Sequence, residues 1–318
     1  MERIAIIGSR VVGTATGKGF SKLGHDVVFV DTDPQVVQRL RQEGLQAIDP
    51  SALAEVQPSV SMICVPTPND RSGRQDLSFL ESALASIGPL LAGGDYHLVV
   101  VRCTVLPTVT ENLVVPALES WSGGKAGRDF GVCMNPEFIR EASAEDDFLN
   151  PWIVVIGELD GRSGDLLEDL YSPLCQRNHT PIFHTDLRTA EMVKYAHNLF
   201  NAAKISFANE MWLVSKELGI DGNQVMGLVA QSAEGMWNPR YGIRGGFPYD
   251  DNCLPKDIGA FVNLAMDFGW PTPLLEATIA VNQRMREAAG RRPALAGRRP
   301  ALAERRPALA GSITSAAS

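Results

Sequence analysis

The sequence predicts an α/β protein in which a Rossmann-like, doubly wound sheet is followed by an all-helical domain with a long central helix. In the first half, short β-branched runs alternate with longer helical patterns, which is the order of parallel strands joined by crossover helices. From about Thr189 the apolar residues recur at helical spacing instead. These two observations place a change of architecture near residue 189.

The expected elements follow one another in a regular order. Strands are expected at "RIAIIG", "DVVFVD", "VSMICVP", "HLVVVRCT", "FGVCMNP" and "WIVVIG", with helices at "GTATGKGFSKLG", "PQVVQRLRQEG" and "LSFLESALASIGPLL". The run "AEMVKYAHNLFNAAKISFANEMWLVSKELG" predicts one long helix that ends at Gly219. Shorter helices are expected around "GNQVMGLVAQ", "DIGAFVNLAMDFG" and "PLLEATIAVNQRMREAA".

Three segments result from this pattern: a Rossmann-like domain over residues 1–188, a helical domain over 189–290 and a tail over 291–318. The tail repeats R-R-P-A-L-A three times. Each repeat is poor in apolar residues, and its proline interrupts a continuous helix. We expect a disordered tail, with a helical or partner-bound tail as the alternative.

The composition limits the classes of partner. The chain has 318 residues, a formal net charge of -8 and a pI near 5.2. An acidic chain lacks the basic field that nucleic acid or an anionic membrane requires, so we expect neither as a partner. No apolar run is long enough to span a bilayer, and "MERIAIIG" enters a strand without the regions of a signal peptide. We therefore expect a cytoplasmic enzyme with a small-molecule substrate.

The five cysteines indicate neither a disulfide framework nor a zinc site, because their number is odd and none forms a C-x-x-C pair. Four are expected to be structural, and they are Cys64, Cys103, Cys133 and Cys175. Cys253 is the exception because its flanks, "GFPYDDNCLPKD", are polar. Acidic neighbours disfavour a thiolate, so these flanks leave its reactivity open.

The turn after the first predicted strand is similar to a dinucleotide-binding fingerprint. In "IAIIGSRVVG", Gly8 and Gly13 flank Val12, but Arg10 stands where the fingerprint has another glycine. Asp31 ends the next strand, where an acid binds the adenosine ribose hydroxyls and repels a ribose phosphate. This favours NAD over NADP. Arg10 either obstructs the cofactor or turns outward and pairs with its pyrophosphate; a strand-turn-helix that binds nothing is the remaining alternative.

Further motifs follow in a fixed order up to about Asn282. They are "VPTP" at 65–68, "RCTVLP" around Thr104, "NPEFIREA" from Asn135, "TAEMVKYAHN" with "ISFANE", "NPRYG" around Arg240, and "CLPKD" at 253–257. In this combination the chain resembles the UDP-glucose/GDP-mannose dehydrogenase family, which oxidises a sugar-nucleotide hydroxymethyl group to a carboxylate in two NAD-dependent steps. The resemblance also implies a homodimer formed around the long helix.

The resemblance assigns roles in the first oxidation. Taking hydride from an alcohol requires a base for the hydroxyl proton and a positive group for the developing oxyanion. Lys194 and Asn198, four residues apart on one helix face, would steady that oxygen. Asp257 would hold an ordered water that helps the proton to leave, and Thr104 would place that water or the nicotinamide.

It also assigns roles in the second oxidation. Cys253 would trap the aldehyde as a thiohemiacetal, which yields a second hydride to become a thioester. Water oriented by Glu137 or Glu141 would hydrolyse this thioester. Lys256 would lie near the cofactor and offset the local acidity.

Two sets of binding residues complete what the fingerprint and the resemblance imply. The cofactor set is Gly8, Arg10, Val12, Gly13, Asp31, Thr67, Thr104, Glu141 and Lys256. The substrate set is Glu137, Phe138, Lys194, Asn198, Arg240 and Tyr249. Taken alone, Lys194 reads as a solvated charge and the pair Glu137 and Glu141 as a polar helix face. His197 has no role in the motif and is expected to be a packing or surface residue.

Two departures from the family pattern bear on the substrate. The typical loop reads like G-F-G-Y-G-G-S-C, whereas Pro248, Asp250 and Asp251 replace its glycines here, so the pocket differs in shape and repels phosphates. The family's second α/β domain, which grips the nucleotide, is expected to be missing, because the repeat tail begins where it would start.

Three hypotheses follow. The first is an NAD-dependent oxidation of a primary alcohol, on a sugar or nucleoside-type substrate, by the cysteine route. The second is a nucleotide-sugar 6-dehydrogenase whose pocket a partner chain completes. The third is a non-catalytic remnant of the family.

Overall fold

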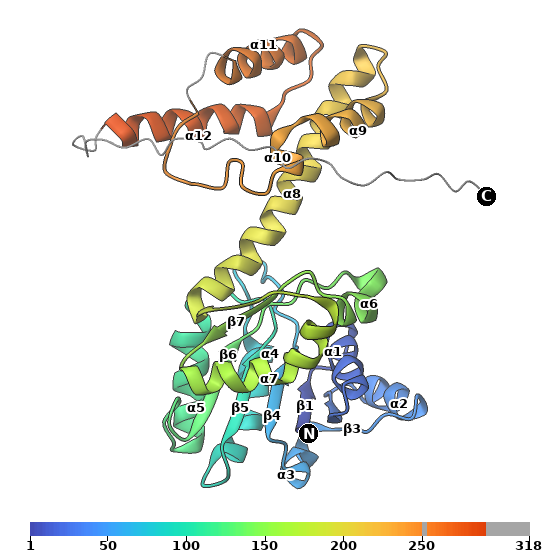
Figure 1. Cartoon of the computed structure of the whole chain (residues 1–318), viewed down its shortest axis with the longest axis vertical. Helices are drawn as coiled ribbons and strands as arrows, with labels where there is room; N and C mark the ends of the chain where they lie inside the picture. The colour runs from blue at the N-terminus through green and yellow to red at the C-terminus, as the bar shows by residue number, and fades with distance from the viewer. Residues whose placement is uncertain (250–252, 291–318) are drawn as a thin grey trace. The chain divides into compact units, whose positions relative to one another are not determined.

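The computed structural model describes residues 1–249 and 253–290. The chain divides into two compact units, Met1–Ala202 and Ala203–Ser318. The division falls inside one continuous helix, α8 (Leu187–Glu217), drawn in yellow-green to yellow in Figure 1. Asp250, Asp251 and the predicted tail lie outside the described residues.

The first unit is built on a sheet with the strand order β3-β2-β1-β4-β5-β6-β7-β8. The strands are β1 (Arg3–Ile7), β2 (Asp26–Val30), β3 (Ala47–Ile48), β4 (Val60–Ile63), β5 (His97–Val101), β6 (Phe130–Met134), β7 (Val154–Glu158) and β8 (Ile182–Asp186). Neighbours are parallel except β6 and β7, which are antiparallel. From β1 the chain moves to β2 and β3 on one side and then to β4 and β5 on the other, which confirms the predicted doubly wound sheet.

The sequence patterns do not predict the two edge strands. β3 has two residues, and β8, "IFHTD", is partly polar with several exposed side chains. An edge strand is held by backbone hydrogen bonds along one side, so it needs no run of buried apolar side chains.

Helices cover both faces of the sheet. One face carries α1 (Val11–Lys22), α2 (Pro34–Gln42), α6 (Ala144–Leu149) and α7 (Gly161–Asn178). The other carries α3 (Leu53–Val56), α4 (Ser78–Ile87) and α5 (Val115–Ser122). Shorter helical turns are η1 (Pro50–Ala52), η2 (Gly88–Leu91), η3 (Thr110–Val114) and η4 (Glu141–Ser143).

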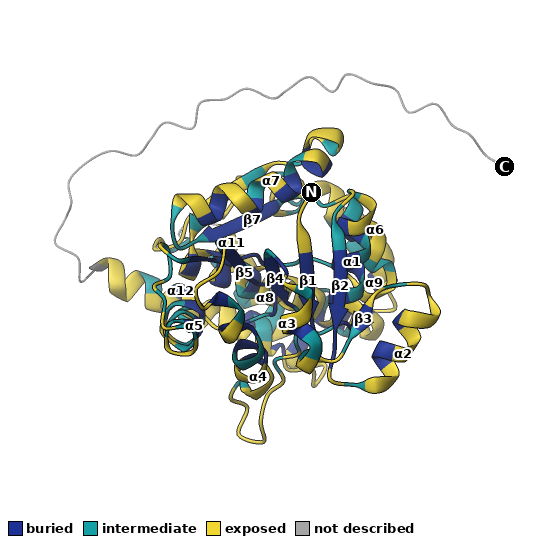
Figure 2. Cartoon of the chain, turned by 90° about the horizontal axis from the view of Figure 1, so that it is seen from below, coloured by how far each residue is buried: buried dark blue, intermediate teal, exposed yellow. Residues whose placement is uncertain are grey.

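Alternate residues of each central strand serve the two faces. Ile4 and Ile6 of β1 belong to the apolar cluster that contains Phe20 of α1, whereas Ala5 and Ile7 belong to the cluster that contains Leu84 of α4. Strands buried on both faces are typical of parallel sheets. Figure 2 accordingly shows the central strands in dark blue.

The described part of the second unit is helical, as predicted. It contains the end of α8, then α9 (Gly222–Ser232), α10 (Glu234–Trp237), α11 (Leu254–Asp267) and α12 (Pro273–Gly290). The predicted long helix ends at Glu217, followed by Gly219 with φ +69°, a common way to end a helix. Among the described residues, no helix has the length and apolar character needed to cross a membrane.

Buried polar groups organise this second unit. The carboxylate of Glu210 accepts hydrogen bonds from the backbone N–H groups of Leu274 at 2.6 Å and Leu275 at 3.3 Å. It thereby satisfies donors in the first turn of α12 that have no partner within the helix. The side chain of Asn282 bonds to both the N–H and the C=O of Tyr249 at 2.9 Å, so the loop that leads toward Cys253 is tied to α12.

Candidate active site

The turn after β1 requires glycine at positions 8 and 13, because other backbone atoms lie close to both residues. Gly8 has φ +88°, and a Cβ there would lie 2.9 Å from backbone atoms of Cys64 and Val65. A Cβ on Gly13 would overlap the carbonyl oxygen of Gly8. Arg10 has φ −81°, which any residue adopts. The turn therefore keeps its shape without a glycine at that position.

The Arg10 side chain turns outward. It is 70% exposed, and its Nη2 lies 3.7 Å from Oδ2 of Asp33. Arg10 borders two cavities, one of about 380 Å³ that includes Asp31 and one of about 420 Å³ that includes Glu141. A guanidinium in this place is available to an anion at the first turn of α1.

The 380 Å³ cavity lies at the carboxyl ends of β1, β2 and β4. Gly8, Asp31 and Cys64 are among the residues that line it. The strand order reverses between β1 and β4, and doubly wound sheets bind dinucleotides at such a switch point.

The Asp31 carboxylate accepts hydrogen bonds from the protein backbone and can still accept others. It is 9% exposed, and its two oxygens accept hydrogen bonds from the backbone N–H groups of Ser9 at 2.8 Å and Asp33 at 2.9 Å. A carboxylate has about four acceptor positions, so two remain for the ribose hydroxyls. The glycine turn, the helix N-terminus and this acid therefore fit NAD.

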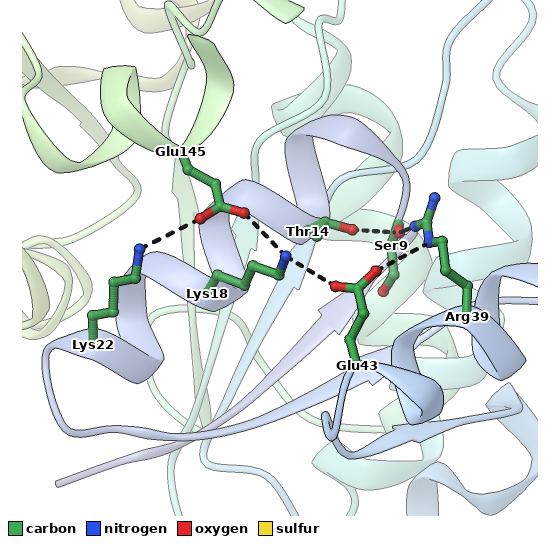
Figure 3. Close-up of polar contacts among 7 residues, drawn as sticks. All are labelled: Ser9, Thr14, Lys18, Lys22, Arg39, Glu43 and Glu145. Atoms are coloured by element: carbon green, nitrogen blue, oxygen red, sulfur yellow. Dashed lines mark hydrogen bonds and ion pairs between the residues drawn. The ribbon is translucent and has the colours of Figure 1, made fainter. Parts of the chain in front are cut away.

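Ion pairs fix helix α1 against its neighbours (Figure 3). Lys18 Nζ lies 2.9 Å from Glu43 Oε2 and 3.0 Å from Glu145 Oε1. Hydrogen bonds to Glu43 and then to Glu145 raise the pKa of Lys18. Arg39 Nη2 donates to the carbonyl oxygen of Ser9 at 3.4 Å. These contacts hold in place the helix whose first turn would face the diphosphate of NAD.

Lys194 is anchored by Glu137. Its Nζ donates to the carbonyl oxygen of Glu137 at 2.6 Å and lies 2.9 Å from the Oε1 of the same residue. The two side chains are 7% and 12% exposed. Lys194 Nζ also lies 5.7 Å from the centroid of the Phe138 ring. The structure thus brings together three predicted residues and holds the ammonium group in one place.

The next turn of α8 carries His197 and Asn198. The His197 ring packs against Phe138 with centroids 4.8 Å apart. Partial burial, and then the charge of Lys194, lower the pKa of His197, so its ring is neutral at pH 7. Asn198 is exposed, four residues after Lys194.

Thr104 lies in a loop that is tied to α8. Its carbonyl oxygen accepts from Thr67 Oγ1 at 2.6 Å and from Gln75 Nε2 at 2.8 Å. Gln75 Nε2 also lies 3.2 Å from Tyr195 Oη. The loops after β4 and β5 are therefore connected to the residue next to Lys194.

The alternative in which Glu137 and Glu141 share one face of a helix is wrong. Residues 135–140 are not helical, and the short turn η4 begins at Glu141. Because Pro136 disfavours a helical conformation at the residue before it, the segment leaves β6 extended. Glu137 is held against Lys194, whereas Glu141 is exposed and borders the cavity beside Arg10.

Three predicted residues of the second unit, Cys253, Lys256 and Asp257, lie at the start of α11. Cys253 is exposed and occupies the N-cap position, and its carbonyl oxygen accepts from the N–H of Asp257 at 2.9 Å. Lys256 pairs with Asp257, and these side chains are 69% and 66% exposed. Tyr249 and Asp257 border one cavity of about 350 Å³ with otherwise mainly apolar walls. Arg240 is exposed.

Sequence reasoning missed three polar residues of the first unit. Gln75 gave no signal. Arg102 and Glu191 are charges inside apolar patterns, "HLVVVRCT" and "AEMVKYAHN", which is a signal of burial. Glu191 is fully buried, and its carboxylate accepts from the N–H groups of Thr108 at 2.5 Å and Thr110 at 2.7 Å.

Two family models match the chain. The NAD binding domain of the UDP-glucose/GDP-mannose dehydrogenase family matches residues 2–175, and the central domain of the same family matches residues 188–284.

Individual proteins show the same similarity. GDP-mannose 6-dehydrogenase from Pseudomonas putida is 37% identical over 302 residues, which cover 88% of this chain and 68% of the relative. UDP-glucose 6-dehydrogenase AglM from Haloferax volcanii is 34% identical, over 89% of this chain and 70% of the relative. A ternary complex of GDP-mannose dehydrogenase from Pseudomonas aeruginosa has a TM-score of 0.83 and 36% identity, over 90% of this chain and 69% of that one.

Since these matches span both units and follow the order of the motifs, the chain belongs to the UDP-glucose/GDP-mannose dehydrogenase family and is an NAD-dependent dehydrogenase that acts on CH–OH groups.

Proposed function

We propose that this chain oxidises the hydroxymethyl group of a nucleotide sugar to a carboxylate in two NAD-dependent steps, with the acyl intermediate held on Cys253. The observation that carries the proposal is the buried ammonium of Lys194, fixed by two oxygens of Glu137. A fixed cation stabilises the oxyanion that develops as hydride leaves an alcohol. The substrate class is supported by relatives named GDP-mannose and UDP-glucose 6-dehydrogenases.

In the first oxidation, Lys194 and Asn198 hold the alcohol oxygen. The hydroxyl proton leaves through a water held by Asp257, and the carbon–hydrogen bond breaks as hydride, so that an aldehyde forms. NAD supplies the hydride acceptor when bound. Thr104 positions the reacting groups.

The second oxidation proceeds on Cys253. Its thiol adds to the aldehyde to give a thiohemiacetal, which loses a second hydride and a proton to become a thioester. Water oriented by Glu141 or Glu137 then releases the carboxylate and restores the thiol. Cys253 is exposed at the N-cap position of α11, as a nucleophile that meets a substrate aldehyde has to be.

The remaining predicted residues bind the cofactor and the substrate. For NAD we assign Asp31 to the ribose; the other cofactor-binding residues are Gly8, Arg10, Val12, Gly13, Thr67, Thr104, Glu141 and Lys256. For the substrate, Phe138, Arg240 and Tyr249 join Glu137, Lys194 and Asn198. Residues 1–188 would then form the NAD-binding domain, 189–290 the catalytic and dimerisation domain, and 291–318 a tail.

A homodimer formed around α8 in the cytoplasm completes the proposal. Helix α8 exposes Leu199, Phe200, Ile205 and Trp212, and large apolar side chains on one element favour a partner surface. The five cysteines form no disulfide with one another, which fits a reducing compartment. Sedimentation of the purified chain tests the dimer.

The central experiment supplies the purified chain with NAD and a panel of GDP-mannose, UDP-glucose, nucleosides and simple polyols. NADH and product mass are measured together. Two equivalents of NADH per carboxylate, from a nucleotide sugar, are expected, and Cys253→Ala should lose acid formation. An undiminished rate of acid formation by Cys253→Ala contradicts the cysteine route, and oxidation of polyols or nucleosides alone contradicts the substrate class.

A further inference from the structure

Arg102 is a buried charge that the mechanism above does not use. It directly follows β5 and is 5% exposed. Its Nη1 donates to Tyr171 Oη at 2.6 Å and to Oδ1 of Asn135, while its buried Nε has no hydrogen-bond partner among the described residues. A buried guanidinium that relies on neutral acceptors costs folding free energy, so its position calls for a reason other than stability.

The Arg102 guanidinium connects the ends of two neighbouring strands. Arg102 follows β5 and Asn135 follows β6, and the guanidinium hydrogen-bonds to the side chain of Asn135. Cys64 follows β4; burial raises the pKa of Cys64, and the charge of Arg102 lowers it by a smaller amount. Tyr171 Oη donates to Asn135 Oδ1 at 2.8 Å, and Asn135 Nδ2 donates to the carbonyl oxygen of Val155 at 2.7 Å. Asn135 therefore has one available orientation.

The fixed Asn135 lies two residues before Glu137, which holds Lys194. A small cavity of about 30 Å³ is lined by Arg102, Asn135, Glu137 and Asp147, among others. A space of this size holds one water molecule. The guanidinium and the residue that anchors Lys194 therefore border the same cavity.

The described groups around Arg102 do not neutralise its positive charge. Burial raises the pKa of Cys64 to about 11 and the pKa of Tyr171 to about 12, so both are neutral at pH 7. The acids that line the shared cavity are Glu137, which is paired with Lys194, and Asp147, which is paired with Arg140.

We propose that Arg102 is a positioning residue for the oxidation: it fixes the segment from Asn135 to Phe138 so that Glu137 holds Lys194, and it adds a permanent positive charge behind that pair. The activity part of this inference rests on the function proposed above. The geometric part does not.

The test compares Arg102→Gln and Arg102→Lys with the control His97→Gln in the full chain. His97 begins the same strand, is 3% exposed, and its Nε2 lies 2.9 Å from Ser61 Oγ. It is thus a buried polar residue at the opposite end of β5. Its replacement should cost stability without changing Lys194.

The first readout is acetylation by acetic anhydride, measured by mass spectrometry as labelling of Lys194 relative to Lys125, whose side chain is 64% exposed. Lys194 should be protected in the parent chain and in His97→Gln. Its relative labelling should rise about tenfold in Arg102→Gln and also rise in Arg102→Lys, which keeps the charge but loses the planar fork. Protection of Lys194 in a folded Arg102 variant overturns the proposal; if Arg102→Gln does not fold, Arg102→Lys decides.

The second readout is kcat/KM as a function of pH. A nearby cation favours the deprotonated alcohol, so the acid limb should move to higher pH in Arg102→Gln, and kcat near neutral pH should fall about tenfold with little change in the KM for NAD. Unchanged profiles in Arg102→Gln count against the proposal. If the parent chain oxidises no substrate, the proposed function fails, and the labelling still decides the role of Arg102.

Discussion

The first unit buries several of its predicted site residues, whereas the predicted residues at the start of α11 in the second unit are exposed. In the first unit, Asp31, Glu137 and Lys194 are largely buried, and hydrogen bonds to the unit's own backbone fix Asp31 and Lys194. In the second unit, the side chains of Lys256 and Asp257 are 69% and 66% exposed, and Cys253 is exposed as well.

This difference separates two contributions to catalysis. Buried groups with fixed partners keep one geometry before the substrate arrives, which is the property that makes an electrostatic site effective. Their replacement should therefore lower stability as well as activity. Exposed groups contribute reactive atoms but little folding free energy, so their replacement should affect activity alone.

The largest expected effect comes from breaking the buried ion pair. Lys194→Met leaves the Glu137 carboxylate without its cation, and we expect the free energy of unfolding to fall by about 3 kcal/mol. Lys256→Met breaks the exposed pair with Asp257 and should leave stability nearly unchanged. Urea denaturation of the two variants measures both. Similar losses from the two replacements would remove the distinction between the units.

The next effect concerns cofactor binding in the first unit. Asp31→Ala removes the acceptor for the ribose and the partner of Ser9, so NAD affinity should fall about 10- to 100-fold. Isothermal titration calorimetry measures this. Asp26→Ala is the matched control, because Asp26 begins the same strand at its other end and pairs with Arg3. An equal loss of NAD affinity in both variants argues against a ribose contact.

A smaller effect tests whether the backbone at Thr108, which a hydrogen bond to the buried Glu191 holds in place, is strained. Thr108 has φ +84°, which is unfavourable for a β-branched residue, and its N–H is held by the buried Glu191. Thr108→Gly keeps that hydrogen bond and should raise the free energy of unfolding by about 1 kcal/mol. Thr108→Ala retains a Cβ and should gain much less. Equal gains in thermal unfolding would mean that the backbone conformation is not strained.

The smallest effect is expected from an exposed cluster in the first unit. Like the exposed residues of the second unit, this cluster should contribute little to the free energy of unfolding. His184 lies between Glu158 at 2.6 Å and Glu168 at 2.7 Å. Partial burial lowers the pKa of His184, but the hydrogen bonds to Glu158 and Glu168 outweigh it and the net pKa is raised. Because the folded-state pKa is the higher one, the stabilisation is complete below the unfolded value near 6.5 and is lost as pH rises through the folded value.

After allowance for solvent screening, this contribution should stay under about 1 kcal/mol. Urea unfolding at about pH 5.5 and about pH 9, in the parent chain and in His184→Gln, measures it. The difference between the two proteins should be present at the lower pH and shrink at the higher one. A difference that grows with pH would contradict the sign.

A strand could be predicted from the sequence where its side chains are buried. β1, β2, β4, β5, β6 and β7 were predicted because they form apolar runs in the sequence. β3 and β8 were not predicted, because one is only two residues long and the other is partly polar, so neither forms an apolar run. The glycine turn and Asp31 were found because their spacing is local to one strand-turn-helix-strand unit.

The sequence proposed candidate site residues one by one but not their arrangement. Glu137 and Lys194 were separate candidates, 57 residues apart, and the sequence suggested a helix face for Glu137 that does not exist. Gln75 and Arg102 form hydrogen bonds to segments that are distant in the sequence, so no local pattern predicts these contacts.

By itself, the sequence determined the fold class and the preference for NAD, and its resemblance to the family supplied candidates for the reactive residues. The fold class and the preference for NAD depend on spacing within a short stretch of chain, such as the glycine turn, the acid after β2 or the period of a helix. Only the tertiary structure decided that Glu137 holds Lys194 and that Arg102 borders the same small cavity as Glu137. Arg102 approaches the segment after β6 because the parallel strands β5 and β6 end at the same edge of the sheet, and Lys194 reaches Glu137 from α8, 57 residues away in the sequence.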